Sequence, residues 1–259
     1  MWWIVPLAVI AIVVVLVGTV VGPFLSLKRL PERAEINGMT LVRDGFVSAA
    51  VVPLSEREVA LVDAGNDRQA KALLAELSRR GLGPDDVKVI LLTHGHSDHM
   101  GGTGRFPKAQ VMALAEEVEV VEGRSTGGGL ILRLRSPKPT GIRLARALHD
   151  GEVVQLGPSQ VRVFAVPGHT PGSAAYAIGA NLFLGDSANQ DKQGRLKAGP
   201  WIFAASAAQN RQSLLELARR LASDTSIKTL VFSHSAPMER GTAPLVEFAA
   251  RVSTTPNPC

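Results

Sequence analysis

Cysteine is nearly absent from this chain of 259 residues. The single cysteine, Cys259, is the last residue. One thiol cannot form a disulfide framework or a thiolate metal cluster, so neither holds the fold together. Aromatic residues make up only 5% of the chain, and they do not interleave with the basic residues as a base-stacking surface requires. The net charge of +5 is therefore no sign of nucleic-acid binding, and we expect no nucleic-acid partner.

Charged residues are missing from the first 27 positions. As a helix, the apolar stretch 4–21 would rise about 27 Å, close to the hydrocarbon thickness of a bilayer. A cleaved secretory signal is the alternative, but no basic residue precedes the apolar run and no small-x-small cleavage site follows it. The sequence therefore predicts an uncleaved, single-pass transmembrane anchor over 1–27. By the positive-inside rule, the main domain would be cytoplasmic, because basic residues follow the anchor: Lys28, Arg29 and Arg33.

Short apolar runs alternate with amphipathic stretches along the remaining chain, and we expect a linker over 28–35 followed by one domain over 36–259. A helix is predicted over 67–80, with Asn66 as its N-cap, and two more over 207–222 and 240–251. Such alternation predicts sheets with helices packed outside. Strands are predicted at 39–43, 46–53, 59–63, 87–92, 110–114, 152–156, 160–166, 173–178, 181–184 and 228–232.

Acidic residues are missing from the segment 123–149, which we interpret as an insertion. One interpretation is a solvated loop with a basic face, and the other is a lid that touches an anionic substrate or a membrane surface. The segment carries six basic residues: Arg124, Arg133, Arg135, Lys138, Arg143 and Arg146.

Histidine is scarce, yet three of the six fall within the stretch LLTHGHSDHMGG at 91–102. His94, His96 and His99 stand there with Asp98 between the last two, directly after the predicted strand 87–92. A regular strand would send alternate side chains to opposite faces, whereas a tight loop lets imidazoles and a carboxylate converge on a metal ion. This pattern predicts a metal site on the loop.

Three further metal-capable residues follow predicted strands: His169, Asp186 and His234. Each alone is typical of a structural or surface residue, but functional loops concentrate at strand ends, and together with the cluster they complete a ligand set. The remaining histidine, His149, fits no such pattern, and we interpret it as structural or surface.

In order along the chain, these residues resemble the motifs of the metallo-β-lactamase superfamily. The resemblance covers about 36–240 and implies an αββα sandwich, an α+β four-layer fold with one or two metal ions at one edge, here preceded by the predicted transmembrane helix. The matching motifs are Asp63 after an early strand, H-x-H-x-D-H at 94–99, G-H-T-x-G at 168–172, G-D at 185–186, and His234.

The resemblance also implies a role for each residue. His94, His96 and His169 would bind a first metal ion, and Asp98, His99 and His234 a second. Asp186 would bridge the two ions, and Asp63 would orient a ligand histidine. The implied cofactors are two divalent ions, zinc in the first place and iron or manganese as alternatives, which would hold a bridging hydroxide as the nucleophile.

The implied function is hydrolysis of a small-molecule ester, thioester or lactone. A cysteine ligand is missing, which argues against β-lactam hydrolysis, and the H-x-H-x-D-H form is more similar to glyoxalase II, lactonases and phosphodiesterases. Glyoxalase II itself is not favoured, because no glutathione-binding signature or long carboxy-terminal substrate domain follows. Ser233 and Ser235 replace the usual glycine-flanked form around the last ligand histidine.

Four other functions stay open at this point. The first two are a phosphodiesterase and a phospholipid hydrolase served by the basic insertion at 123–149. The others are a mononuclear iron enzyme of the persulfide-dioxygenase type and a non-catalytic, metal-stabilised binding module tethered to a membrane.

Overall fold

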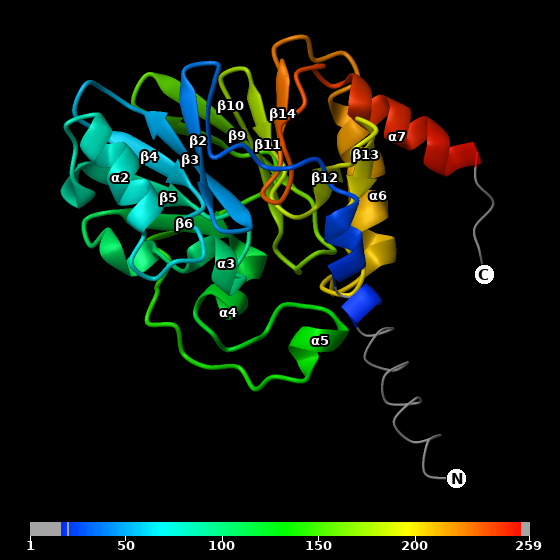
Figure 1. Ribbon diagram of the computed structural model, residues 1–259, viewed down its shortest axis with the longest axis horizontal. Coiled ribbons are helices and arrows are strands. Elements are labelled where there is room, and N and C mark those ends of the chain that lie inside the picture. Colours follow the sequence, from blue (N-terminus) through cyan, green and yellow to red (C-terminus); the bar gives the residue numbers. More distant parts are fainter. Residues whose placement is uncertain (1–16, 20, 255–259) are drawn as a thin grey trace.

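Two β-sheets face each other at the centre of the computed structural model, which describes residues 17–19 and 21–254 (Figure 1). The first sheet has seven strands in sequence order, antiparallel from β1 to β4 and parallel from β4 to β7. Its strands are β1 Arg33–Ile36, β2 Met39–Asp44, β3 Val47–Pro53, β4 Val59–Val62, β5 Val87–Leu91, β6 Gln110–Leu114 and β7 Arg146–Leu148.

The second sheet has five strands in the order β14-β11-β10-β9-β8, of which only the β11–β14 pair is parallel. Its strands are β8 Val153–Leu156, β9 Ser159–Ala165, β10 Ala174–Ile178, β11 Asn181–Phe183 and β14 Thr229–Val231, and a separate hairpin joins β12 Ala188–Gln190 to β13 Leu196–Ala198. Both mixed sheets are largely buried, as strands with covered faces require.

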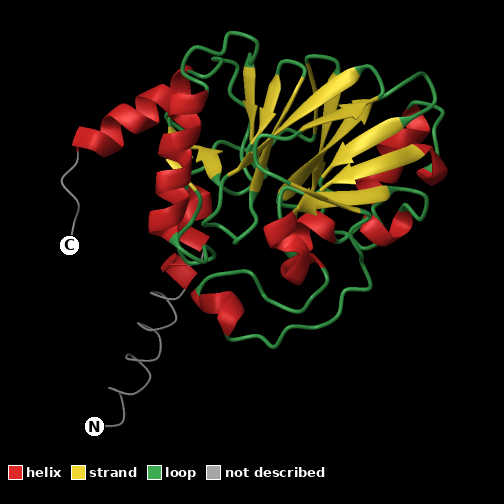
Figure 2. Cartoon of the chain, turned by 180° about the vertical axis from the view of Figure 1, so that it is seen from behind, coloured by secondary structure: helices red, strands yellow, loops and turns green. Residues whose placement is uncertain are grey.

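Helices cover the outer faces of both sheets, as the view from behind makes clear (Figure 2). α2 Lys71–Arg79 packs on the first sheet through Leu73 and Leu77, while α6 Ala207–Arg220 and α7 Ala243–Thr254 pack on the second. A third apolar cluster fills the space between the sheets. The predicted αββα sandwich is therefore confirmed. Short helical turns complete the set: Pro84–Asp86, α3 Ser97–Met100, Thr103–Arg105, Ala115–Glu117, α4 Val118–Val121 and α5 Leu130–Arg133.

The predicted transmembrane anchor is wrong for the part of it that the structure describes. No helix among residues 17–19 and 21–254 is long and apolar enough to cross a membrane, which overturns the single-pass location and the cytoplasmic orientation that followed from it. Residues 1–16 and 20 of the predicted anchor lie outside the described residues.

The end of the predicted anchor packs against the domain instead. Leu27 is buried and forms an antiparallel bridge with Asp191, and the amide of Lys28 donates to the carbonyl of Gln190 at 3.0 Å. Helical turns at 17–19 and 21–25 precede this contact. The apolar side chain at this end of the run is therefore buried against protein.

Two local predictions also differ from the structure. β1 begins at Arg33, inside the predicted linker 28–35, because pairing with β2 supplies hydrogen bonds that the local sequence does not reveal. The N-cap of α2 is Ala70, with φ 49°, rather than Asn66. The Asp67 carboxylate accepts from the amides of Gln69 and Lys71 and so forms the turn that displaces the helix start.

Candidate metal centre

The seven predicted ligands meet at one edge of the sandwich, and they come from both sheets. His94 and His96 lie on the loop after β5, and α3 presents Asp98 and His99. From the second sheet, His169 lies between β9 and β10, Asp186 follows β11, and His234 follows β14. The structure therefore brings together all the residues predicted to bind metal, in two groups.

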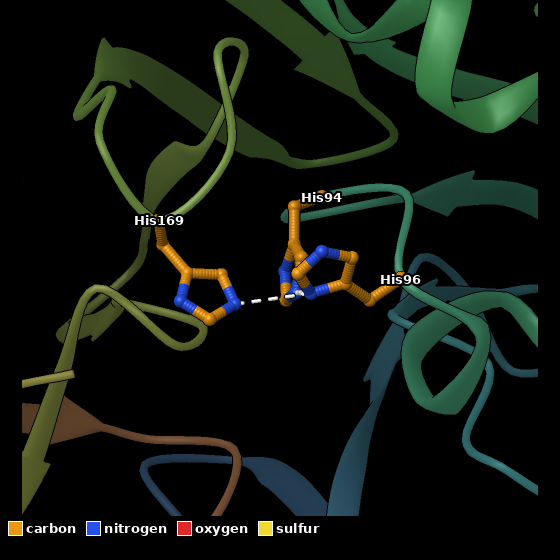
Figure 3. A group of neighbouring side chains, drawn as sticks. All are labelled: His94, His96 and His169. Atoms are coloured by element: carbon orange, nitrogen blue, oxygen red, sulfur yellow. Dashed lines mark hydrogen bonds between the residues drawn. The ribbon is translucent and has the colours of Figure 1, made fainter. Parts of the chain in front are cut away.

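The first group consists of three imidazoles that point toward one another from two loops (Figure 3). The Nδ1 atom of His96 lies 3.1 Å from Nε2 of His94 and 3.1 Å from Nε2 of His169. Two nitrogens bound to one zinc ion at tetrahedral angles lie about 3.3 Å apart. The three ring nitrogens thus have the spacing of ligands that share one ion.

The second group combines two carboxylates and two imidazoles. Asp186 Oδ1 lies 3.3 Å from His99 Nε2, and Asp186 Oδ2 lies 3.1 Å from His234 Nε2. The Oδ2 atom of Asp98 completes the group at 3.4 Å from His234 Nε2. Within the group, one ligand atom from each residue lies within 4.8 Å of the others.

Asp186 lies between the two groups. Its Oδ2 atom is 3.4 Å from Nε2 of His169 and 4.0 Å from Nε2 of His94, both in the first group, and 3.1 Å from His234 in the second. A carboxylate with this placement can serve two ions at once.

Asp63 holds two of the ligand rings in place from behind. Its Oδ2 atom accepts from Nδ1 of His99 at 2.8 Å and from the hydroxyl of Thr93 at 2.9 Å, and that hydroxyl lies 3.1 Å from Nδ1 of His94. A proton held on Nδ1 leaves Nε2 as the free donor atom toward a metal ion. His234 is oriented in the same way, since its Nδ1 lies 2.9 Å from the carbonyl of Phe46.

Buried polar atoms without partners show that the donor set fits metal ions. His99 Nε2 and Asp186 Oδ1 face each other in the second group, and neither has a hydrogen-bond partner among the described residues. Buried polar atoms seldom remain unsatisfied, because each costs about 1–3 kcal/mol. A divalent cation between them would satisfy both.

The pKa values of the histidines differ between the two groups. Burial, reinforced by the neighbouring histidines, lowers the pKa of His94 well below its usual value, and burial lowers the pKa of His96 to about 3 and of His169 to about 4. These rings are therefore neutral and have lone pairs to donate. Burial also lowers the pKa of His234, but Asp186 outweighs this effect and raises it to about 10. Without a cation, the Asp186 carboxylate thus keeps a proton on His234, and a metal ion bound there would take the place of that proton.

Glu117, which the sequence analysis missed, connects the two loops of the first group. Its buried carboxylate accepts from the amide of Gly95 at 2.8 Å, and on the other loop from the hydroxyl of Thr170 at 2.9 Å and the amide of Gly172 at 2.7 Å. Burial raises the pKa of Glu117 to about 6, against the effect of these three donors. The only sequence signal was a glutamate closely following a predicted strand.

The basic insertion has two parts. In one part the arginines form ion pairs with glutamates, and the other part lies against the site. Arg124, Arg143 and Arg146 form ion pairs with glutamates, and β7 extends the first sheet. Residues 126–135, which we name the arm, include α5 and cross to the segment 201–205, where the amide of Gly129 donates to the carbonyl of Phe203 at 2.9 Å. Figure 1 shows α5 near the lower end of α6.

The arm also touches the first ligand group. A Cβ atom at Gly128 would lie 3.0 Å from Nε2 of His96, and one at Gly129 would lie 2.4 Å from the carbonyl oxygen of Ala204. Glycine is needed at position 129, because a Cβ atom there would overlap a backbone oxygen. Part of the insertion therefore lies against the site. His149, interpreted as structural or surface, is exposed at the far end of the insertion.

Comparison with known families and proteins agrees with this geometry. The family profile described as the metallo-beta-lactamase superfamily matches residues 42–234. Hydroxyacylglutathione hydrolase from Serratia proteamaculans (strain 568) is 34% identical over 140 residues, which are 54% of this chain and 46% of that protein. The human metallo-beta-lactamase domain-containing protein 1 is 32% identical over 137 residues, 51% of this chain and 44% of that protein. The chain thus spans about half the length of these curated relatives.

Solved structures share the fold. A metallo-beta-lactamase family protein from Thermus thermophilus superimposes with a TM-score of 0.60 at 26% identity, covering 85% of this chain and 81% of that one. A subclass B3 metallo-beta-lactamase of Bradyrhizobium japonicum gives a TM-score of 0.63 at 20% identity, covering 88% and 93%.

Proposed function

Because this chain belongs to the metallo-beta-lactamase superfamily, we propose that it is a hydrolase that uses two divalent metal ions to cleave a small-molecule ester, thioester or lactone. The observation that carries the proposal is the position of Asp186, whose carboxylate lies between two separate groups of ligand atoms. A purely structural metal site needs no carboxylate shared by two ions.

The two groups of side chains support a role for each proposed ligand. His94, His96 and His169 would hold one ion, and the second would lie among the side chains of the other group, Asp98, His99, Asp186 and His234. Zinc is the ion we propose, because imidazole nitrogen dominates the donor set and three nitrogens converge with near-tetrahedral spacing. When bound, two such ions lower the pKa of a water molecule and polarise the oxygen of the scissile group.

Protein groups next to the proposed ligands hold the ligand rings in fixed orientations. Asp63 fixes the ring of His99, the Thr93 hydroxyl that Asp63 holds fixes the ring of His94, and Phe46 fixes His234 through its carbonyl. Asp98 is part of the ligand set and so is not a free general base. The relatives named hydroxyacylglutathione hydrolase favour an acyl substrate over a phosphodiester for this chain.

Substitution of the shared carboxylate tests the proposal. We expect Asp186→Ala to lower zinc content from two ions per chain and to reduce turnover at least a hundredfold, because both groups lose a ligand. The matched control is His149→Ala, which changes an exposed histidine outside the site and should leave both quantities unchanged. The measurement is metal analysis of each variant, together with hydrolysis of p-nitrophenyl esters, acyl thioesters, lactones and bis(p-nitrophenyl) phosphate.

Four different results of the metal analysis and the substrate assays would contradict the proposal. Equal losses in the two variants would contradict the ligand assignment. Hydrolysis of the phosphodiester alone would reassign the substrate class, and one iron per chain with oxygen consumption would replace hydrolysis by oxygenation. A protein that binds zinc but cleaves none of the substrates would be a binding module.

A further inference from the structure

Exposed apolar side chains are concentrated on the segments of the chain that contact the metal centre. Of the nine large hydrophobic side chains that are exposed among the described residues, seven lie on segments that contact the site, while Val153 and Val246 lie elsewhere. The seven are Val17, Val21, Leu25, Phe46, Leu130, Leu134 and Trp201. Isolated exposed hydrophobic residues are ordinary, but a gathering of them marks a surface that binds something apolar.

A chain of contacts ties these segments to the second ligand group. The ring of Phe46 stacks on His234 with centroids 5.7 Å apart, and the ring of Phe24 meets His234 edge-on at 5.6 Å. Phe24 also meets Phe203 edge-on at 5.8 Å, and Phe203 accepts the hydrogen bond from the arm. Aromatic rings thus flank a proposed ligand on two sides.

The arm and the segment 201–205, which are bonded to each other, add two further exposed apolar side chains. Leu130 follows directly on Gly129, which is bonded to Phe203, and is 61% exposed, while Trp201 lies two residues before Phe203 and is 56% exposed. Arg133 adds a second link, since its guanidinium donates to the carbonyl of Ala205 at 3.4 Å. We name the set Phe24, Phe46, Leu130, Trp201 and Phe203 the apolar rim.

The burial of the proposed ligands limits the kind of molecule that can bind at the apolar rim and still reach the metal centre. The histidine ligands and Asp186 are at most 9% exposed, and the Asp98 side chain is 20% exposed. A folded protein surface could not reach atoms so deeply placed, whereas the end of a slender linear group could. An acyl chain has that shape, and its methylenes gain by leaving water for an aromatic surface.

We propose that the apolar rim binds the hydrocarbon chain of the substrate, so that the enzyme prefers medium-length acyl esters or thioesters to acetyl ones. This inference rests on the proposed hydrolase function and adds the nature of the acyl group. The carbonyl would lie at the metal centre while the chain lies along Trp201 and Leu130.

The test is a chain-length series on the zinc-loaded full chain. p-Nitrophenyl esters and thiocholine thioesters from acetyl to octanoyl are compared below their micelle-forming concentrations. We expect kcat/KM to rise roughly two- to fourfold for each added methylene over part of the series. Trp201→Ala and Leu130→Ala should each lower the octanoyl-to-acetyl ratio of kcat/KM by about fivefold or more.

The control variant is Val153→Ala, an exposed apolar residue on β8 that is outside the apolar rim and should keep the wild-type ratio. Zinc content identical to the wild type shows that each variant is folded. A wild-type ratio near one, or a high ratio that neither rim variant lowers, would overturn this inference while the proposed function stands. Failure to cleave any acyl substrate would overturn the proposed function itself.

Discussion

Glu117 shows how one buried carboxylate can set the spacing of a metal site that it does not touch. It accepts hydrogen bonds from the loop of His94 and His96 and from the loop of His169. The glutamate is fully buried, so these loops are joined by bonds that water does not weaken. The three nitrogens of the first ligand group depend on this link for their relative positions.

Glu117→Gln is the corresponding prediction. The amide would place an N–H group against one of the three donors, and we expect the zinc affinity of the first group to fall roughly 10- to 100-fold. Competition with a chromophoric chelator measures the zinc affinity of the first group and that of the second group separately. Glu116→Gln, at the neighbouring carboxylate, is the matched control. Equal affinities in the wild type and Glu117→Gln would show that the carboxylate plays no positioning role.

The proposed ligands could be predicted from sequence, whereas the supporting residue Glu117 could not. His94, His96, Asp98 and His99 stand close together, and His169, Asp186 and His234 each follow a strand, so local pattern indicates all seven. Asp63 was predicted from the resemblance alone. Glu117 has no motif, because its role depends on two loops that lie together only in the folded chain.

At the scale of elements, a cluster of charges joins β1 to α2. Glu76 is buried, and its carboxylate accepts hydrogen bonds from Nε of Arg33 at 2.8 Å and from Nε of Arg80 at 3.0 Å. Burial raises the pKa of Glu76, but the two guanidinium groups outweigh it and bring the pKa from 4.5 to about 2. The edge strand is thereby fixed to the helix layer.

We expect Glu76→Gln to lower the free energy of unfolding by about 1–3 kcal/mol at pH 7, because charge-assisted hydrogen bonds are lost. The folded pKa is depressed, so this stability is present above pH 4.5 and is lost as the pH falls toward 2. Urea unfolding at pH 7 and pH 3 measures the effect. Glu35→Gln changes the exposed partner of Arg33 and should cost little. A constant difference between Glu76→Gln and the wild type at both pH values would contradict the linkage.

Elements with an apolar run in the sequence could be predicted, and short strands without such a run could not. The strands at 110–114 and 181–184 and the helix at 207–222 match β6, β11 and α6 to within two residues, because their apolar patterns reflect burial. The structure adds β1, β7, β12 and β13, each of three or four residues, which are held by pairing partners distant in the chain or by a tight hairpin. Local pattern carries too little information for such strands.

At the scale of the whole molecule, two contacts join the sheets beside the metal centre. The hydroxyl of Tyr176 on β10 donates to the carbonyl of Leu92 at 2.8 Å, and the amide of Ala174 donates to the carbonyl of Thr93 at 2.8 Å. Tyr176 is fully buried in the core between the sheets. The two halves of the sandwich are thus aligned next to the first ligand histidine.

Tyr176→Phe should lower the free energy of unfolding by about 1–2 kcal/mol, since the ring still fills the core while the Leu92 carbonyl loses its donor. Denaturant unfolding of the metal-free protein measures this without interference from bound ions. Val153→Ala, at an exposed position, should leave the midpoint unchanged. A fall of less than about 0.3 kcal/mol in Tyr176→Phe would mean that another donor, or water, replaces the hydroxyl.

The ligands between His94 and His234 come from both sheets, and this has a consequence for the life of the protein. An unfolded chain cannot present the shared carboxylate and the two groups together, so cations would bind the native state selectively and would shift the folding equilibrium by mass action. The supply of metal ions would therefore govern how long each molecule persists as well as how fast it works.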